Sequence, residues 1–312
     1  IDMSKRNYFI IIAILVAVDI ATAFWYLAGH INSDGKNDFF SAGSELATEA
    51  DTLNENFVPD KYQTIEYNAF FVSKAPVIPS DQRTYYTSIK RLKTNIPTSI
   101  NGETNTDRLL AEVARKAFPN SHGGLDNGVQ NFLKSPAFNV PNVDYKVINS
   151  APTIFAKYGN VQGVKIYPIF TSKNYLVMAI NRSSYKGVVT QNTAYYVNYN
   201  RYSHSIISKE DIFINDVDNK LLSIVNDKIE KLNEDQPNLE LHQANTLSQE
   251  IYLRKNGLFF VYQAGIIADE AEGVIEIYIP FSTLNPYLKP EFSSLITTNS
   301  HCQELKPLAF AK

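Results

Sequence analysis

Three carboxylates, Asp269, Glu270 and Glu272, stand close together in an otherwise apolar stretch, "NGLFFVYQAGIIADEAEGVIEIYIPFSTL", at positions 256–284. Two carboxyl groups on either side of a glycosidic bond can hydrolyse it as general acid and base or nucleophile. Neighbours on one loop cannot easily flank a bond, and a charged connection between strands is typical of a solvated surface loop. The pattern favours a loop that could contact a ligand, with hydrolysis as the alternative.

Tyrosines form a second cluster, in the predicted strand "KGVVTQNTAYYVNYNR". Tyr195 and Tyr199 share a face of this strand, and Tyr202 follows it. Exposed tyrosines could contact a protein or stack on a sugar. Packing beneath the long predicted helix described below is the alternative, and the sequence favours it because aromatic residues are common in sheets. Tyr195, Tyr199 and Tyr202 are therefore only candidate ligand contacts.

The sequence contains no motif for a disulfide, a metal site, nucleotide binding or a known class of hydrolase. Cys302 is the single cysteine, so neither an internal disulfide nor a cysteine-based metal site can form. The 5 histidines are scattered without metal-ligand or catalytic spacing, and His122 and His204 fall in predicted turns. Nucleotide-binding glycine loops, H-E-x-x-H and G-x-S-x-G are absent. We therefore predict no catalytic residue, no metal site and no cofactor.

Composition narrows the class of protein. The chain has 312 residues, 44% hydrophobic and 20% charged, which is ordinary for a globular protein of one large or two modest domains. The net charge of −3 gives no electrostatic footprint for nucleic acid. A nucleic-acid partner is therefore not expected.

The N-terminal region carries the membrane signal. Lys5 and Arg6 precede an apolar run at 8–29, which as a helix spans about 33 Å, enough to cross a bilayer. The aromatic triplet 24–26 suits the membrane interface, and the basic pair predicts a cytoplasmic N-terminus. A cleavable signal peptide ending at Ala-Thr-Ala, 21–23, is the alternative.

Domain organisation follows from this segment. We expect an anchor or signal segment at 1–30 and a polar linker at 31–60, rich in Asn, Asp, Glu and Ser. A small α+β domain follows at 61–149, then a larger α+β domain at 150–290 and a tail at 291–312. The basic pair predicts that the chain after the apolar run lies outside the cytoplasm. Together with the family resemblance described below, this implies a bacterial cell-envelope location: a single-pass inner-membrane protein with a periplasmic or extracellular C-terminal domain.

Periodicity supplies the expected elements. Runs rich in β-branched and aromatic residues predict strands at 62–72 and 84–94, and strand follows strand from about 143 to 201. Helical spacing predicts a helix at 105–118 and a longer one at 216–233, whose stripe includes Leu221, Val225 and Ile229. The predicted fold class is α+β, with mostly antiparallel sheets and a few helices packed on one face.

A family resemblance emerges in the same C-terminal stretch. "NGLFFVYQAGIIADEAEGVIEIYIPFSTLNPYL" resembles the signature of the C-terminal domain of RsiV-like envelope proteins, which is also found attached to PdaC-type deacetylases. "SKEDIF" and "AYYVNYN" resemble the elements before it. The positions in register are Gly257, Leu258, Phe260, Tyr262, Ile267, Ala268, Ala271, Gly273, Ile279, Pro280 and Leu284. The resemblance covers about 150–290 and implies an ectodomain that, in RsiV-like members, binds lysozyme.

The departures from that signature are informative. Ala264, Gly265 and Ile266 stand where the family has Pro-Tyr-Glu, and Asp269 and Glu270 stand where it has Pro-Tyr. Only Met3 to Asn7 precede the apolar run, too few residues for a sigma-binding domain, and no deacetylase metal motif is present. We therefore expect a membrane-anchored, non-enzymatic ectodomain that binds a macromolecule. A lysozyme-like protein is the first expectation, and a peptidoglycan- or other glycan-binding module or a hydrolase is the alternative.

Overall fold

The computed structural model describes residues 58–74, 86–137, 142–148, 159–186, 189–236 and 239–307. These residues all fall within one compact unit, Leu53–Lys312. The predicted membrane segment, 8–29, and most of the predicted linker lie outside the described residues. Among the helices that are described, none is long and apolar enough to cross a membrane.

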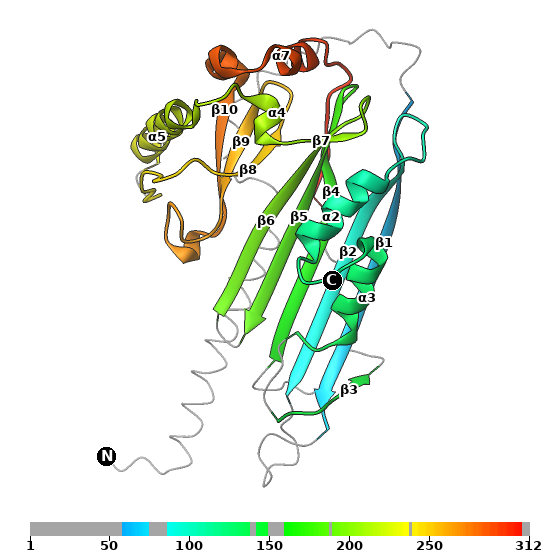
Figure 1. Ribbon diagram of the computed structural model, residues 1–312. Coiled ribbons are helices and arrows are strands. Elements are labelled where there is room, and N and C mark those ends of the chain that lie inside the picture. The colour runs from blue at the N-terminus through cyan, green and yellow to red at the C-terminus, as the bar shows by residue number, and fades with distance from the viewer. Residues whose placement is uncertain are drawn as a thin grey trace, which may run out of the picture. The chain divides into compact units, whose positions relative to one another are not determined.

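A large twisted sheet forms the body of this unit (Figure 1). It has 8 strands, in the order β3-β1-β2-β4-β5-β6-β7, with β11 pairing the end of β4. The strands are β1 (Lys61–Ser73), β2 (Thr87–Ser99), β3 (Tyr145–Ile148), β4 (Gly159–Thr171), β5 (Tyr175–Lys186), β6 (Val189–Asn200), β7 (Ser205–Ile207) and β11 (Gln303–Glu304). Neighbours are antiparallel except for β2 and β4, which run parallel.

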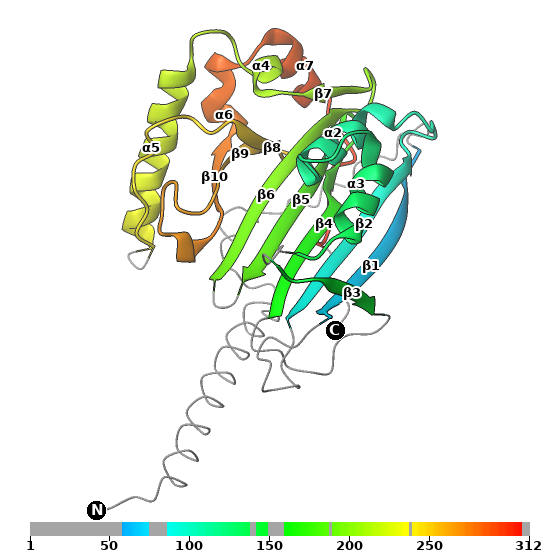
Figure 2. The ribbon, with the colours of Figure 1, turned by 60° about the horizontal axis from the view of Figure 1, so that its bottom comes forward.

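The parallel pair requires a crossover connection, and two helices form part of it. Helices α2 (Asp107–Ala117) and α3 (Gly124–Lys134) lie between β2 and β4 in the chain and cover one face of the sheet (Figure 2). Leu109 and Val113 of α2 are buried against Leu92, Ile166 and other side chains of that face. Because β2 pairs with β4, strands from 61–149 and from 150–290 belong to one sheet.

A second, smaller sheet packs on the opposite face. Its strands are β8 (Glu250–Leu253), β9 (Gly257–Tyr262) and β10 (Ile275–Pro280), antiparallel in the order β10-β9-β8. One face of this sheet meets the large sheet, where Tyr252 of β8 stacks on Tyr196 of β6 with ring centroids 4.2 Å apart. The other face is covered by α5 (Asp218–Asp235), as Figures 1 and 2 show.

Helix α5 confirms the longest helical pattern in the sequence. Its predicted stripe of Leu221, Val225 and Ile229 is buried in one cluster with Ile277 of β10. Short elements complete this side: α4 (Lys209–Ile212), η2 (Glu270–Glu272), α6 (Phe281–Leu284), η3 (Asn285–Tyr287) and α7 (Pro290–Thr297). The mixed α+β class with antiparallel-rich sheets is confirmed. Each sheet buries one face against helices and the other face against the other sheet, and this packing of two sheets was not predicted.

A buried ion pair fixes the start of β1. The Arg201 guanidinium, in the turn after β6, lies 2.5 Å from the Asp60 carboxylate, and both side chains are buried. Asp60 also accepts hydrogen bonds from the Tyr62 hydroxyl and the Thr171 hydroxyl, each at 3.2 Å, and from the Asn101 amide at 3.3 Å. This cluster ties the first residues of β1 to the β4–β5 and β6–β7 turns. Burial, followed by the Asp60 charge, raises the pKa of Tyr62.

Candidate functional site

The predicted acidic loop is a short surface connection between β9 and β10. We call residues 263–274 the acidic loop. Asp269, Glu270 and Glu272 are all exposed, and Glu270–Glu272 forms the single turn η2. Gly265 and Gly273 adopt positive φ angles of 79° and 75°, which turn the chain at either end of the acidic segment. The sequence prediction of a solvated inter-strand loop is therefore what the structure shows at this position.

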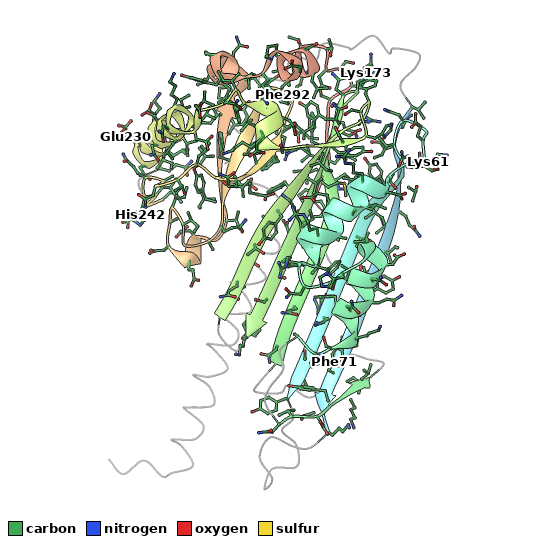
Figure 3. The ribbon with its side chains drawn as sticks, viewed as in Figure 1. Lys61, Phe71, Lys173, Glu230, His242 and Phe292 are labelled. Carbon is green, nitrogen blue, oxygen red and sulfur yellow. The ribbon has the colours of Figure 1, made fainter. Side chains whose placement is uncertain are left out.

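Two buried residues hold the acidic loop in place. Ile267 and Ala268 insert into the core beneath it, and the Ile267 carbonyl accepts a hydrogen bond of 2.7 Å from the His242 amide. His242 is labelled in Figure 3 beside the loop. The Gln263 side chain accepts from the Ala194 amide at 3.1 Å and donates to the Ala194 carbonyl at 2.6 Å. The loop is thus fixed to both sheets and to the chain segment after α5.

An apolar side chain lies at the surface of the same loop. Ile266 is 61% exposed, whereas its neighbour Ile267 is fully buried. A Cβ built on Gly265 would lie 3.3 Å from the Glu270 Cγ, so the Ile266 segment and the acidic segment lie against each other. Within the described residues, no salt bridge neutralises the carboxylates of Asp269, Glu270 or Glu272. The loop therefore presents negative charge around an exposed apolar side chain.

None of the three acids lines the pocket that the structure describes. This pocket has a volume of about 170 Å³, and its lining includes Lys116, Tyr196 and Lys209. Its two lysines are already paired, Lys116 with Glu250 at 2.7 Å and Lys209 with Asp218 at 2.8 Å. Among the described residues, no group of His, Cys, Asp and Glu is arranged to hold a metal ion.

The structure separates the three candidate tyrosines. Tyr199 is fully buried and Tyr195 is half-buried, both on the face of the large sheet that α2 covers rather than beneath the long helix α5. The Tyr199 hydroxyl lies 3.1 Å from Nδ1 of His204. Tyr202, in the following turn, is 55% exposed. Of the three, Tyr202 alone presents its ring to solvent, on a different element from the acidic loop.

A cluster between the two sheets was not predicted. Glu276 of β10 accepts hydrogen bonds from the hydroxyls of Tyr196 and Tyr252, the latter at 2.7 Å. Rings of Tyr252, Phe259 and Tyr278 continue the stack across the small sheet. The alternation in "VIEIYIP" places Glu276 opposite the isoleucines, but only the tertiary fold shows that this second face is covered.

Burial and charge perturb the tyrosines of this cluster. Burial, with a smaller contribution from the Glu276 charge, raises the pKa of Tyr167 to about 12. The same two causes raise the pKa of Tyr196 and of Tyr252. These phenols therefore stay protonated at neutral pH, and two of them donate to Glu276. The hydrogen bonds to Glu276 join the two sheets, and the rings of Tyr167, Tyr196 and Tyr252 are buried in the core.

Comparison with known proteins gives one family match. Residues 210–282, from α4 to α6, match the family described as "Protein of unknown function (DUF3298)". This range lies inside the stretch that resembles RsiV-like proteins, and that finer assignment stays a prediction. No curated protein matches the chain.

Two solved structures that match this chain carry the same family description. A DUF3298 family member from Bacteroides fragilis is 15% identical, with a TM-score of 0.54, and the match covers 78% of this chain and 100% of that one. A DUF3298 family protein from Pseudomonas aeruginosa is 14% identical, with a TM-score of 0.45 and coverage of 75% and 96%. The chain thus shares the fold of the first of these proteins, and its residues 210–282 form a DUF3298 domain.

Proposed function

We propose that this protein is a non-enzymatic, envelope-anchored ectodomain that binds another protein through the acidic loop. The observation that carries the proposal is the exposure of Ile266 beside the unpaired carboxylates of Asp269, Glu270 and Glu272. Protein interfaces commonly join an apolar contact at the centre to polar groups at the rim. The negative charge favours a basic partner.

The anchoring of the loop supports binding. Association costs less free energy when the contacting segment is already ordered, because fewer side-chain and loop conformations are lost. Ile267 and Ala268 fix the loop from below, and the Gln263 amide ties its start to β6. Ile266 is therefore presented in a defined position that a concave surface on a partner could receive.

The identity of the partner rests on the resemblance. RsiV-like ectodomains bind lysozyme, so a lysozyme-like protein is the partner we propose to test first. The motif positions in register are mostly buried, namely Gly257, Leu258, Phe260, Tyr262, Ile267, Ala268, Ile279 and Leu284. The departures Ala264, Gly265, Ile266, Asp269 and Glu270 are half-buried or exposed. This chain therefore keeps the scaffold positions and differs at the surface, as expected if its contact residues suit its own ligand.

Binding of the full chain to lysozyme, measured by titration calorimetry, tests the proposal. The double variant Glu270→Gln with Glu272→Gln should weaken binding at least tenfold, because each lost charge reduces electrostatic attraction to a basic surface. The matched control Asp227→Asn with Glu230→Gln removes the same charge from the exposed side of α5 and should change the affinity less than twofold. Equal losses in both variants would show that net charge, not the loop, governs binding.

The alternatives give different outcomes in the same preparation. Sedimentation of the chain with insoluble peptidoglycan in the absence of any protein partner would indicate a glycan-binding module. Release of soluble sugars or acetate, lost in the variant Asp269→Asn, Glu270→Gln, Glu272→Gln, would indicate a hydrolase, because acid–base groups each contribute roughly 10²- to 10⁴-fold. We expect neither.

A further inference from the structure

An open sheet edge lies along β1, far in sequence from the acidic loop. The inner side of β1 pairs with β2 from Lys61 to Val72. The outer side pairs with β3 only at Phe70–Ser73. Figures 1 and 2 show β1 at the side of the large sheet, with the short β3 beside one end, and Figure 3 labels Lys61 and Phe71 along it. In the described part of the chain, the outer edge of Tyr62–Ala69 has no strand partner.

From Tyr62 to Ala69 this edge lacks most of the features that usually prevent strand addition. Natural sheets protect their edges with short strands, prolines, lysines, inward charges or bulges. The register shift in β1 lies between Lys61 and Tyr62, at the start of this segment. The described edge strands β3 and β7 are short, at 4 and 3 residues, but β1 has 13. Tyr62–Ala69 contains no proline and no lysine. Its single charge, Glu66, is already paired with Lys93 of β2 at 3.1 Å.

The side chains beside the edge are apolar on one face. Ile65, Tyr67 and Ala69 alternate along β1 and share a face with Phe71, whose partner in β3 is Val147. Tyr67 is 42% exposed and Val147 is 67% exposed. A strand added at this edge would gain main-chain hydrogen bonds and also cross-strand contacts with this apolar row.

A second copy of the same chain fits this edge. Two sheets joined edge to edge by a two-fold axis keep their faces aligned, so each residue pairs with one on the same face. With Ile65 on the axis, Ile65 meets Ile65 of the second copy, and Thr64 meets Glu66 of the second copy. Tyr67 then meets Gln63 of the second copy. This register places no like charges opposite each other, whereas an axis at Glu66 would oppose two carboxylates.

We infer that two copies of this chain associate by antiparallel pairing of their β1 edges at Tyr62–Asn68, with Ile65 at the two-fold axis. The large sheets of the two copies then form one continuous sheet. This association uses neither the acidic loop nor its ligand. A foreign strand of another protein is the competing occupant, and the register at Ile65 distinguishes it from a second copy.

Disulfide trapping in the full chain, purified in detergent, tests the register. In a Cys302→Ser background, Ile65→Cys should form a covalent dimer on mild oxidation, because directly opposed Cα atoms lie about 4.5–5.5 Å apart, within disulfide range. The matched control Tyr67→Cys should crosslink at least tenfold more slowly, since its two copies would be about 13 Å apart along the strands. Combining Gln63→Cys with Tyr67→Cys should restore rapid crosslinking.

Sedimentation velocity of the chain with only native side chains provides the second measurement. The dimer fraction should rise with concentration and fall at least tenfold in Ile65→Lys, which opposes two ammonium groups at the axis. Equal crosslinking of Ile65→Cys and Tyr67→Cys, or a monomer at every concentration up to about 100 µM, which is ample for a specific interface, would overturn the inference. Capture of another protein's strand by a monomeric chain would overturn it as well.

Discussion

At the residue scale, the structure shows which of the candidate contact residues are exposed and which are buried. Ile266 and its neighbouring carboxylates are at the surface, where they suit a partner, while Tyr199 is in the core. Alternation along a strand predicts which residues share a face, and it placed Tyr195 and Tyr199 together. It does not say which face is covered, because that depends on α2, a helix far away in the chain.

A buried lysine gives a prediction about pH. Lys90 of β2 is 5% exposed, with its ammonium 4.5 Å from the Phe132 ring centroid, and burial lowers its pKa to about 8. Between pH 8 and the ordinary lysine value of 10.5, the unfolded state binds the proton more strongly than the folded state, so this residue makes stability rise with pH. Below pH 8 the charged form is buried, at a cost to the folded protein.

Lys90→Met should therefore raise the free energy of unfolding at pH 7 by roughly 1–3 kcal/mol, because it removes a buried charge. The gain over the parent should shrink between pH 8 and 9.5, measured by urea denaturation below the range where unfolded tyrosines ionise. Lys146→Met, at an exposed position of β3, is the control and should stay within about 0.5 kcal/mol. If the gain in the free energy of unfolding did not change with pH, it would contradict the lowered pKa of Lys90.

At the element scale, the buried Asp60–Arg201 pair determines how β1 begins. Asp60→Ala leaves the Arg201 guanidinium buried without its carboxylate, and such losses cost about 3–5 kcal/mol. Asp144→Ala is the control, because it breaks an ion pair with Lys74 whose side chains are 84% and 61% exposed. That change should cost no more than about 1 kcal/mol. Equal decreases in melting temperature for the two variants would show that the buried pair does not stabilise the fold more than an exposed pair does.

Helix α5 offers a test of packing between elements. Val225 is fully buried against the small sheet, so Val225→Asp buries an unpaired charge and should cost several kcal/mol. Asp227→Val, on the exposed side of the same helix, changes hydrophobicity in the opposite sense and should have little effect on chemical denaturation. Unchanged stability in Val225→Asp would refute the packing of the stripe on β10.

The elements differ in how far the sequence predicts them. The stripe of Leu221, Val225 and Ile229 was predictable, because helical spacing and burial on one side are local properties. The cluster around Glu276 was not, since it joins β6, β8 and β10 across 80 residues of chain. No local pattern distinguishes a carboxylate that faces water from one that accepts two tyrosine hydrogen bonds.

At the scale of the whole molecule, the main difference from the prediction is that the two ranges expected to form separate domains, 61–149 and 150–290, contribute strands to one sheet. The sequence places strands at 62–72 and in the region after 143, but their pairing is non-local. The parallel contact of β2 with β4 makes one sheet from both ranges. The exposed acidic loop lies at the far end of the small sheet from the β8–β9 turn, and the open edge of β1 belongs to the large sheet. The proposed binding surface and the proposed dimer edge are therefore separate.

Hydrogen exchange of the full chain with and without lysozyme tests the central proposal most directly. If the acidic loop is the contact surface, amides of residues 263–274 should exchange more slowly in the complex, because a bound partner excludes water and restricts local opening. Amides of β1 at Tyr62–Ala69 should be unchanged by lysozyme. Protection of the loop is the result we predict. Unchanged exchange at 263–274 under conditions where lysozyme is bound would contradict the proposed binding surface.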